Sequence, residues 1–171
     1  DAKKASVAEG EVAAVSAKLP VAYLNIDSLL SNYQFAQEAN EKLMTKQEDA
    51  RLKLNTKLRT LQNEMADFQR KLDNGAFLSQ ERAQKEYQKL QKKQQDLEQL
   101  EAKLTQDILE ENQALNLQLS DSLMNYLKIY NADGRFEIIL NNNAKDNILM
   151  AADGYDITQD VVNGLNARYA K

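Results

Sequence analysis

Carboxylates are the side chains best placed for chemistry in this sequence. Asp107 lies three positions before Glu110 and four before Glu111, a spacing that puts them on one side of a helix. Such a group could hold a metal ion or act in acid–base catalysis. The 171 residues include no histidine and no cysteine, which removes the commonest general base, the thiol nucleophile and the usual ligands of zinc and haem. We therefore expect that the protein is not an enzyme and has no catalytic, cofactor-binding or metal-binding residues.

Other ligand classes are also disfavoured. The segment DNGAFLSQE (73–81) lacks the acidic ligands of a calcium loop, and no glycine-rich phosphate loop is present. GYDITQD (154–160) could offer a helix N-terminus to an anion, but the carboxylate of Asp156 would repel it. A net charge of −4 and an aromatic content of 6% argue against nucleic acid as a partner.

The composition favours long helices in one domain of ordinary length. The chain contains one proline, five glycines and no tryptophan, and 28% of its residues are charged. This leaves too few large apolar side chains for a globular core of this size. No apolar run reaches the about 18 residues needed to cross a bilayer. Because the chain starts at Asp1 and not at methionine, we expect that a targeting segment has been removed before it.

Two helical stretches face each other across one short turn at DNG (73–75). Within residues 28–72, the seam positions from Leu54 to Leu72 lie alternately four and three residues apart. Within residues 79–130, those from Ala83 to Leu115 do the same when the polar Gln94, Glu101 and Glu111 are included, which is the pattern of a coiled coil. Gly75 can adopt the positive φ that ends the first helix, and Ser79 can cap the second. We expect an antiparallel helical hairpin arm over residues 28–130, with its tip at 73–78. The predicted seam contains Leu54, Leu58, Leu61, Met65, Phe68, Leu72, Ala83, Tyr87, Leu90, Leu97, Leu104, Ile108 and Leu115. Upstream, Ala50, Leu54 and Leu58 are four apart, an inserted step that locally unwinds the pair.

The two ends of the chain are expected to form a small β body, made of residues 20–27 and 131–171, after a flexible leader over residues 1–19. VAYLNI (21–26), RFEIILN (135–141) and NILMA (147–151) are typical of short strands. Asp27 is the predicted cap of the first arm helix, and Asp156 with Gln159 is the predicted capping box of a last helix. The expected fold class is therefore α+β. Three short strands have open edges and little core, so we expect copies of the chain to join into one body.

The strand VAYLNID that leads into a very long hairpin, and the closing FEIILNNN and NILMAADGYDITQDVVNGLN, resemble the OmpH/Skp family of periplasmic chaperones. The resemblance covers residues 20–171. It implies a homotrimer in which strands from three chains form a central β body, from which three hairpins hang around a cavity. Such a trimer holds unfolded outer-membrane proteins in the periplasm of a Gram-negative bacterium without ATP. The trimer-body residues that it implies are Val21, Tyr23, Leu24, Ile26, Phe136, Ile138, Ile139, Leu140, Ile148, Leu149 and Met150.

The charge of the chain departs from the strongly basic familiar members of this family, because its pI is near 5.0. Residues 70–93 nevertheless carry seven cations against three anions, a net charge of +4 that leaves −8 for the rest of the chain. The cations are Arg70, Lys71, Arg82, Lys85, Lys89, Lys92 and Lys93. This basic tip could meet anionic lipid or acidic segments of a client. It could equally be an ordinary solvated helix surface with pairs such as Glu81–Lys85.

Contact with unfolded clients needs apolar side chains that the seam does not use. Leu52, Phe77, Leu78 and Leu100 are the candidates, because many weak apolar contacts on a bending arm suit promiscuous binding. The alternative for these residues is local packing, with Phe77 and Leu78 under the turn. The alternative function is a structural spacer or scaffold of the cell envelope that uses the same trimer and arms. Either protein could be tethered to a membrane through the leader.

Overall fold

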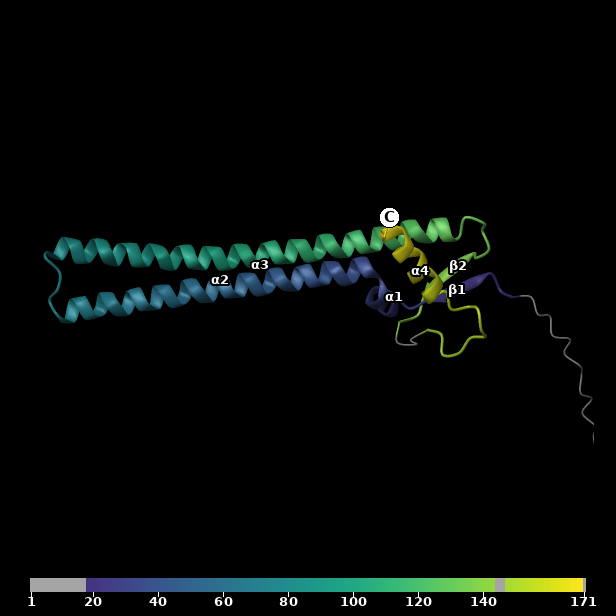
Figure 1. Cartoon of the computed structure of the whole chain (residues 1–171), viewed down its shortest axis with the longest axis horizontal. Coiled ribbons are helices and arrows are strands. Elements are labelled where there is room, and N and C mark those ends of the chain that lie inside the picture. The colour runs from purple at the N-terminus through teal and green to yellow at the C-terminus, as the bar shows by residue number, and fades with distance from the viewer. Residues whose placement is uncertain (1–17, 144–146, 171) are drawn as a thin grey trace, which may run out of the picture.

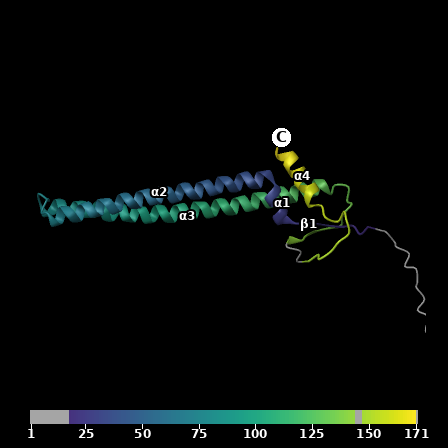
Figure 2. The same cartoon turned by 60° about the horizontal axis from the view of Figure 1, so that its bottom comes forward.

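The computed structural model describes residues 18–143 and 147–170. Two long helices extend from one end of the molecule, where all other elements gather (Figure 1). In chain order the elements are β1 (Val21–Leu24), α1 (Ile26–Asn32), α2 (Gln34–Asp73), α3 (Gln80–Tyr130), β2 (Ile138–Asn141) and α4 (Thr158–Tyr169). A second view shows the same long pair leaving one end (Figure 2). We call α2, α3 and their turn the arm, and the remaining elements with the root of α3 the base. The predicted α+β class with a helical hairpin is confirmed, and residues 1–17 of the predicted leader lie outside the described residues.

The arm turns at residues 74–79. α2 ends at Asp73, and Gly75 has a φ of 62°, a left-handed conformation that glycine adopts without a Cβ penalty. The Ser79 hydroxyl accepts a hydrogen bond from the N–H of Arg82 at 3.3 Å and so caps α3. The predicted roles of Gly75 and Ser79 are confirmed. With 40 and 51 residues, α2 and α3 are roughly 60 and 75 Å long.

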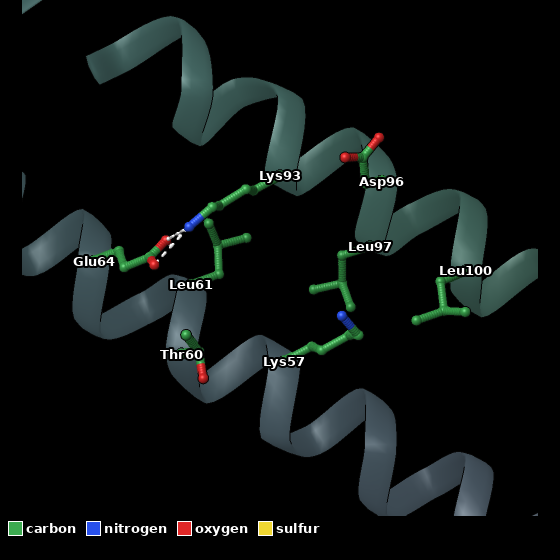
Figure 3. A pocket seen from close by; sticks show the side chains of 8 residues that line it. All are labelled: Lys57, Thr60, Leu61, Glu64, Lys93, Asp96, Leu97 and Leu100. Atoms are coloured by element: carbon green, nitrogen blue, oxygen red, sulfur yellow. Dashed lines mark hydrogen bonds and ion pairs between the residues drawn. The ribbon is translucent and has the colours of Figure 1, made fainter.

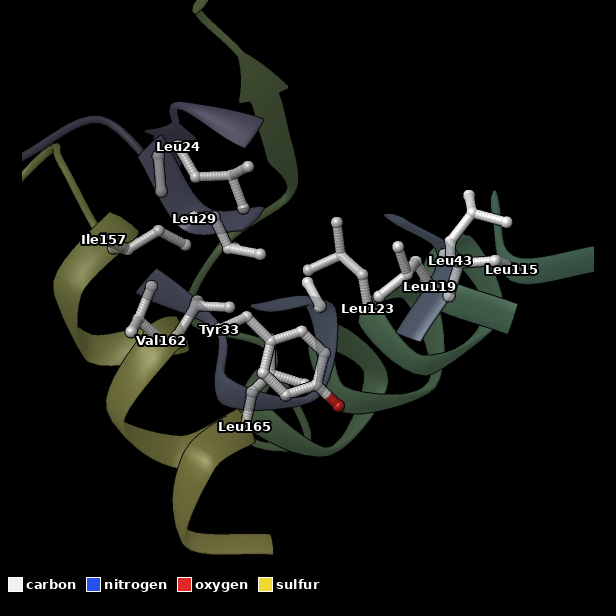
Figure 4. Close-up of a cluster of buried hydrophobic side chains, with 13 residues drawn as sticks. Leu24, Leu29, Tyr33, Leu43, Leu115, Leu119, Leu123, Ile157, Val162 and Leu165 are labelled. Carbon is white, nitrogen blue, oxygen red and sulfur yellow. The ribbon is translucent and has the colours of Figure 1, made fainter. Parts of the chain in front are cut away.

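The main hydrophobic core lies in the base, where α4 packs against α1, α2 and α3 (Figure 4). Leu29 and Val161 are its most deeply buried large side chains. Gly164 lets α4 approach α3 closely, because an added Cβ would lie 1.6 Å from the hydroxyl oxygen of Tyr126. The buried members of this core are Ala22, Leu24, Leu29, Tyr33, Ala36, Leu43, Leu115, Leu119, Leu123, Ile157, Val161, Val162 and Leu165.

The described part of the chain contains one two-stranded sheet, in which β1 and β2 run parallel. Val21 is paired with Ile138, and Leu24 with Asn141. The other edge of β1 is covered by residues 155–157. The N–H of Tyr23 donates to the carbonyl of Tyr155, and the carbonyl of Tyr23 accepts from the N–H of Ile157, both at 2.9 Å. Strand β1 is therefore flanked on both sides, whereas β2 is an edge strand.

The predicted third strand over residues 147–151 is wrong. Residues 148–150 form a loop, in which Leu149 and Met150 are 85% and 91% exposed. The Asn142 side chain holds the start of this loop: its Oδ1 accepts from the N–H groups of Asn147 and Ile148 at 3.1 and 2.9 Å, and its Nδ2 donates to the Ile148 carbonyl at 3.0 Å. The Asn142 side chain thus supplies backbone hydrogen bonds that a strand over residues 147–151 would otherwise need from a neighbouring strand.

The first helix starts earlier than predicted. Ile26 opens α1 and does not extend the strand, and Asn25, not Asp27, is its cap, with Oδ1 accepting from the N–H of Ser28 at 2.8 Å. Asn141 and Asn143 complete the cap, because their Oδ1 atoms accept from the N–H groups of Ile26 and Asp27, both at 3.3 Å. Residues from the far end of the chain therefore decide where α1 begins.

The helical pattern predicted to run unbroken to Leu72 is interrupted at Tyr33, which is extended (φ −85°, ψ 114°). At α4, Oδ1 of Asp156 accepts a hydrogen bond from the N–H of Thr158, the first residue of the helix, at 2.9 Å. Asp156 therefore satisfies one backbone donor at the start of α4. Ile157 is nevertheless the residue that directly precedes the helix. The predicted capping box does not form, because Gln159 donates its amide to Asn163.

Candidate functional site

One edge of the arm is held by ion pairs between its two helices. Lys46 pairs with Glu111, Glu64 with Lys93 at 2.6 Å, and Lys71 with Glu86 at 3.0 Å. The two residue numbers of each pair add up to 157, so α2 and α3 keep one register from root to tip. On α2 these residues each lie three positions after a buried one, namely Leu43, Leu61 and Phe68. We call this side the ionic edge.

The opposite edge of the arm is apolar and open. Leu58, Met65 and Leu72 recur every seven residues on α2, and each lies three or four positions from Leu61 or Phe68, on the side away from the ion pairs. These three side chains, with Tyr87 of α3, are between 43% and 47% exposed. Tyr87 stacks on Phe68 with ring centroids 5.9 Å apart. We call Leu58, Met65, Leu72 and Tyr87 the apolar edge.

The predicted seam therefore divides into two rows, and the structure buries only one of them. A single neighbouring helix covers one row of side chains and leaves the next row at the rim of the contact. The buried seam residues are Leu61, Phe68, Leu90 and Leu115; the half-buried ones are Leu54, Ala83, Leu97, Leu104 and Ile108; the exposed ones are Leu58, Met65, Leu72 and Tyr87. Sequence spacing identified all of these residues but could not say which row α3 would cover.

The inserted step predicted on α2 has a counterpart on α3. The row of α2 side chains that faces α3 takes a step of four residues from Ala50 to Leu54. The facing row of α3 takes a step of four residues from Leu104 to Ile108. The two steps lie opposite each other in the register that the ion pairs define. The register therefore survives the step, and a groove of about 260 Å³ opens there, lined by Lys46, Asp49, Ala50, Lys53, Leu104, Asp107, Ile108 and Glu111.

A second groove, of about 320 Å³, lies nearer the tip on the ionic edge (Figure 3). The Glu64–Lys93 pair closes one end of it, and Leu61 and Leu97 lie at its floor between the helices. Leu100, one of the predicted client contacts, lines this groove and is half-buried. Carboxylates in both grooves are interspersed with lysines, and within residues 18–143 and 147–170 no group of three or more metal-binding side chains gathers.

The other predicted client contacts differ from one another. Phe77 packs on Phe68, with ring centroids 5.5 Å apart, and, like Leu97, is partly buried against the small arm core of Leu61, Phe68 and Leu90. For Phe77 the structure thus favours the local-packing alternative. Leu78 is 83% exposed at the tip, and Leu52 is exposed on α2. These two leucines, unlike Phe77, leave their apolar surface open to a partner.

Four of the seven cations of the basic tip are engaged in ion pairs. Lys71 contacts Asp67 at 3.2 Å as well as Glu86, Arg70 contacts Asp67, Lys85 contacts Glu81 at 2.8 Å, and Lys93 contacts Glu64. Hydrogen bonds from Lys71 and Arg70 lower the pKa of Asp67, and bonds to Glu86 and Asp67 raise the pKa of Lys71. Arg82, Lys89 and Lys92 make no ion pair with any described residue. They recur at seven- and three-residue spacing on α3, and so share one side of that helix.

The predicted body residues also fall into two sets. Leu24 is buried in the chain's own core, and Phe136 and Ile139 pack against it. Val21, Tyr23, Ile26 and Ile148 are half-buried. Ile138 and Leu140 on β2, and Leu149 and Met150 on the loop, are instead largely exposed. The exposed set lies on or after the edge strand, where a neighbour could pair.

The comparisons with known proteins agree with this architecture. Residues 20–165 match the family model described as outer membrane protein (OmpH-like). A solved structure of a candidate outer membrane chaperone (OmpH-like) from Caulobacter crescentus CB15 superposes with a TM-score of 0.76 at 16% identity, covering 89% of this chain and 86% of that one. No curated protein matches the sequence. None of the helices in the described ranges is both long and apolar enough to span a bilayer. On the strength of the family match over most of its length, the chain belongs to the OmpH-like family of outer membrane proteins.

Proposed function

We propose that this protein is an ATP-independent holdase chaperone of the periplasm that encloses unfolded outer-membrane proteins between its arms. The observation that carries the proposal is the apolar edge: three heptad-spaced side chains and a tyrosine stay more than two-fifths exposed along an otherwise charged arm. The family match and the similar fold of an OmpH-like candidate chaperone support it. No catalytic residue and no cofactor are part of the proposal.

The chemistry of the apolar edge suits a changing set of unfolded clients. Leu58, Met65 and Leu72 recur about 10 Å apart along the helix, and Leu58 lines an open groove of about 290 Å³ with Leu54 and Leu97, so a row of separate contacts is offered and no particular client shape is demanded. Each contact buries little area, and weak contacts exchange quickly. Leu52 and Leu78 add exposed apolar surface elsewhere on the arm. A client is thus shielded from other clients while no single contact traps it.

A homotrimer is the assembly that we propose for the base. One chain leaves β2 as an edge strand beside four exposed apolar residues, Ile138, Leu140, Leu149 and Met150, and such an edge is prone to pair with another chain. Three copies joined there would present three arms around one cavity. In this assembly residues 20–27 and 131–171 form the body together with α1 and the root of α3, which pack in the base. The remainder of residues 28–130 forms the projecting arm, and residues 1–19 are the leader that could tether the trimer to a membrane.

The basic tip is proposed as a weak contact for anionic lipid or for acidic segments of a client. Arg82, Lys89 and Lys92, which are unpaired among the described residues, supply the charge, and Leu78 supplies apolar surface at the end of the arm. Contacts of this kind weaken as salt is added, because they are between exposed charges.

Light scattering tests the holdase function. A urea-unfolded outer-membrane barrel protein is diluted into buffer with the purified protein or without it. We expect suppressed aggregation at about one trimer per client, with a discrete soluble complex. The triple variant Leu58→Ser, Met65→Ser, Leu72→Ser should lose most of this suppression, since the apolar edge is gone.

A matched variant shows whether this loss is specific to the apolar edge. Leu117, Met124 and Ile129 are exposed to a similar or greater degree on the root of α3, and changing all three to serine should leave the suppression intact. An equal loss of aggregation suppression in both variants would mean that any exposed apolar surface of the protein can bind the client. A stable wild-type trimer that leaves aggregation unchanged would instead favour the spacer of the cell envelope.

A further inference from the structure

The joint between α1 and α2 is a helix break without a helix-breaking residue. Residues 26–40 contain no glycine and no proline, yet Tyr33 is extended between the two helices. Ser31, Asn32 and Tyr33 are weaker helix formers than alanine or leucine, but none of them ends a helix as proline does. The break therefore needs partners for the backbone groups that it frees, and the contacts of Tyr33 and its neighbours show which residues supply them.

One side chain of α4 supplies two of the hydrogen bonds that the broken helix lacks, and Gln37 of α2 supplies a third by donating its Nε2 to the carbonyl of Ser31 at 2.7 Å. Oδ1 of Asn166 accepts from the N–H of Gln34, the first residue of α2, at 2.8 Å. Nδ2 of the same amide donates to the carbonyl of Asn32, the last residue of α1, at 3.0 Å. Tyr33, the residue in the capping position, makes no side-chain cap bond of its own. Asn166 thus caps the end of one helix and the start of the next from outside.

A second contact from α4 holds the first turns of α2. The Tyr169 hydroxyl donates to Oε2 of Glu38 at 2.7 Å, and the Tyr169 ring lies 5.4 Å from Phe35 and 6.4 Å from Tyr33 between centroids. The hydroxyl of Tyr33 reaches α3, where it meets Oγ of Ser122 at 3.0 Å. α4 is itself fixed in the core by Val161, Val162 and Leu165.

The two arm helices are attached to the base in different ways. α3 continues without a break from the tip into the core, where Leu119 and Leu123 are buried. α2 begins at the joint, and Ala36 and Leu43 in its first turns are buried in the same core. Because the tip is closed by the turn at 74–79, bending the arm requires α2 to slide along α3, as one layer of a two-layer beam slides along the other. Such sliding displaces the start of α2 at the joint at Tyr33 relative to the base.

We propose that α4 is a clamp that sets the stiffness of the arm, by locking the root of α2 at this joint through Asn166 and Tyr169. With the clamp closed, α2 and α3 bend as one body. With the clamp open, the first turn of α2 shifts and the arm bends more easily. The proposal concerns the mechanics of the arm and stands whether or not the arm binds clients.

Spin-label distances test the clamp directly. The chain has no cysteine, so cysteines placed at the exposed positions Arg59 on α2 and Asn125 on the root of α3 accept labels selectively. Labelled chains are mixed with excess unlabelled chain, so that each assembly carries at most one labelled copy. Asn166→Ala should broaden the distance distribution and speed amide exchange at residues 34–38 about tenfold, the effect of a lost helix cap.

Three further variants distinguish a clamp from general destabilisation. Asn166→Asp keeps the acceptor for Gln34 but loses the donor to Asn32, and should fall between wild type and Asn166→Ala. Tyr169→Phe removes one hydroxyl and should broaden the distribution less; it carries the test if Asn166→Ala does not fold. Asn163→Ala, at an exposed asparagine one turn earlier on α4, should match wild type.

Two results would overturn the proposal. The first is a wild-type distance distribution in both Asn166→Ala and Tyr169→Phe. The second is a broadened distribution accompanied by fast amide exchange at residues 161–165, since α4 would then have unfolded from the core and the base, not the clamp, would have failed.

Discussion

The base and the arm are built on different amounts of buried surface. Thirteen buried residues from five elements and the α4 cap form the core of the base, whereas the separate core of the arm contains three, Leu61, Phe68 and Leu90. The arm depends mainly on the hydrogen bonds of two long helices and on one row of side chains between them. This difference makes the base the better-anchored part of the fold and the arm the part that leaves apolar side chains exposed. The predictions below test that division, from the largest effect to the smallest.

The largest effect is expected in the base. Leu29 is fully buried against α4, and Leu29→Ala should lower the free energy of unfolding by about 3 kcal/mol, because a cavity remains where the side chain was. Urea unfolding followed by circular dichroism measures the loss. An unchanged unfolding midpoint would show that the base is not the anchor of the fold.

A smaller and local effect is expected within the arm. Leu61→Ala removes one of the three buried side chains of the separate arm core and should cost about 1–2 kcal/mol, since a two-helix contact relaxes more readily than a closed core. Amide exchange should speed up at residues 54–72 and 83–104 and stay unchanged at residues 157–165. Equal acceleration in both regions would mean that arm and base unfold as one unit.

Leu58→Ala is the counterpart of Leu61→Ala on the apolar edge, three residues away. Its side chain is already 44% exposed, so the change should alter the free energy of unfolding by no more than about 0.5 kcal/mol. The same urea series measures it. A loss as large as that of Leu61→Ala would show that the apolar edge is covered in solution, for example by another copy of the chain.

The smallest effect is an acid sensitivity of the arm tip. The pKa of Asp67 is lowered below its ordinary value of 3.8 by Lys71 and Arg70. A lowered pKa stabilises the fold above the ordinary value, and this stabilisation is lost as the pH falls through the folded pKa. Amide exchange near residues 64–74 should therefore speed up below about pH 4.

Asp67→Asn is the control for this acid effect. The variant should have the faster exchange already at neutral pH and little further change at low pH. Because the Asp67 side chain remains 43% accessible to solvent, added salt should weaken the effect in the wild type. An acid response of the same size in Asp67→Asn would assign it to other groups.

Features decided by neighbouring residues could be predicted from the sequence. The turn of the arm follows from Gly75 and Ser79, whose conformations depend on the few residues around them. The heptad spacing likewise identified the apolar positions of both arm helices. The α+β class and the placing of one strand before the arm and another after it followed from the same local patterns.

Features decided by distant residues could not be predicted. The run NNN (141–143) reads as a polar turn, yet Asn141 and Asn143 cap α1 and Asn142 holds the loop that follows. The break at Tyr33 depends on Asn166, more than 130 positions away. The apolar edge was hidden in the predicted seam, because spacing identifies apolar rows and only the packing of α2 on α3 decides which row is covered.

The constant register of the ion pairs limits how such an arm can change in length. A segment inserted into α2 alone would move Lys46 away from Glu111 and turn every later side chain around the helix. Insertions that keep both edges must therefore be matched between α2 and α3, and one heptad added to each helix extends the arm by about 10 Å. Arm length, and with it the span that the arm can enclose or bridge, thus varies in discrete steps while the tip and the base stay the same.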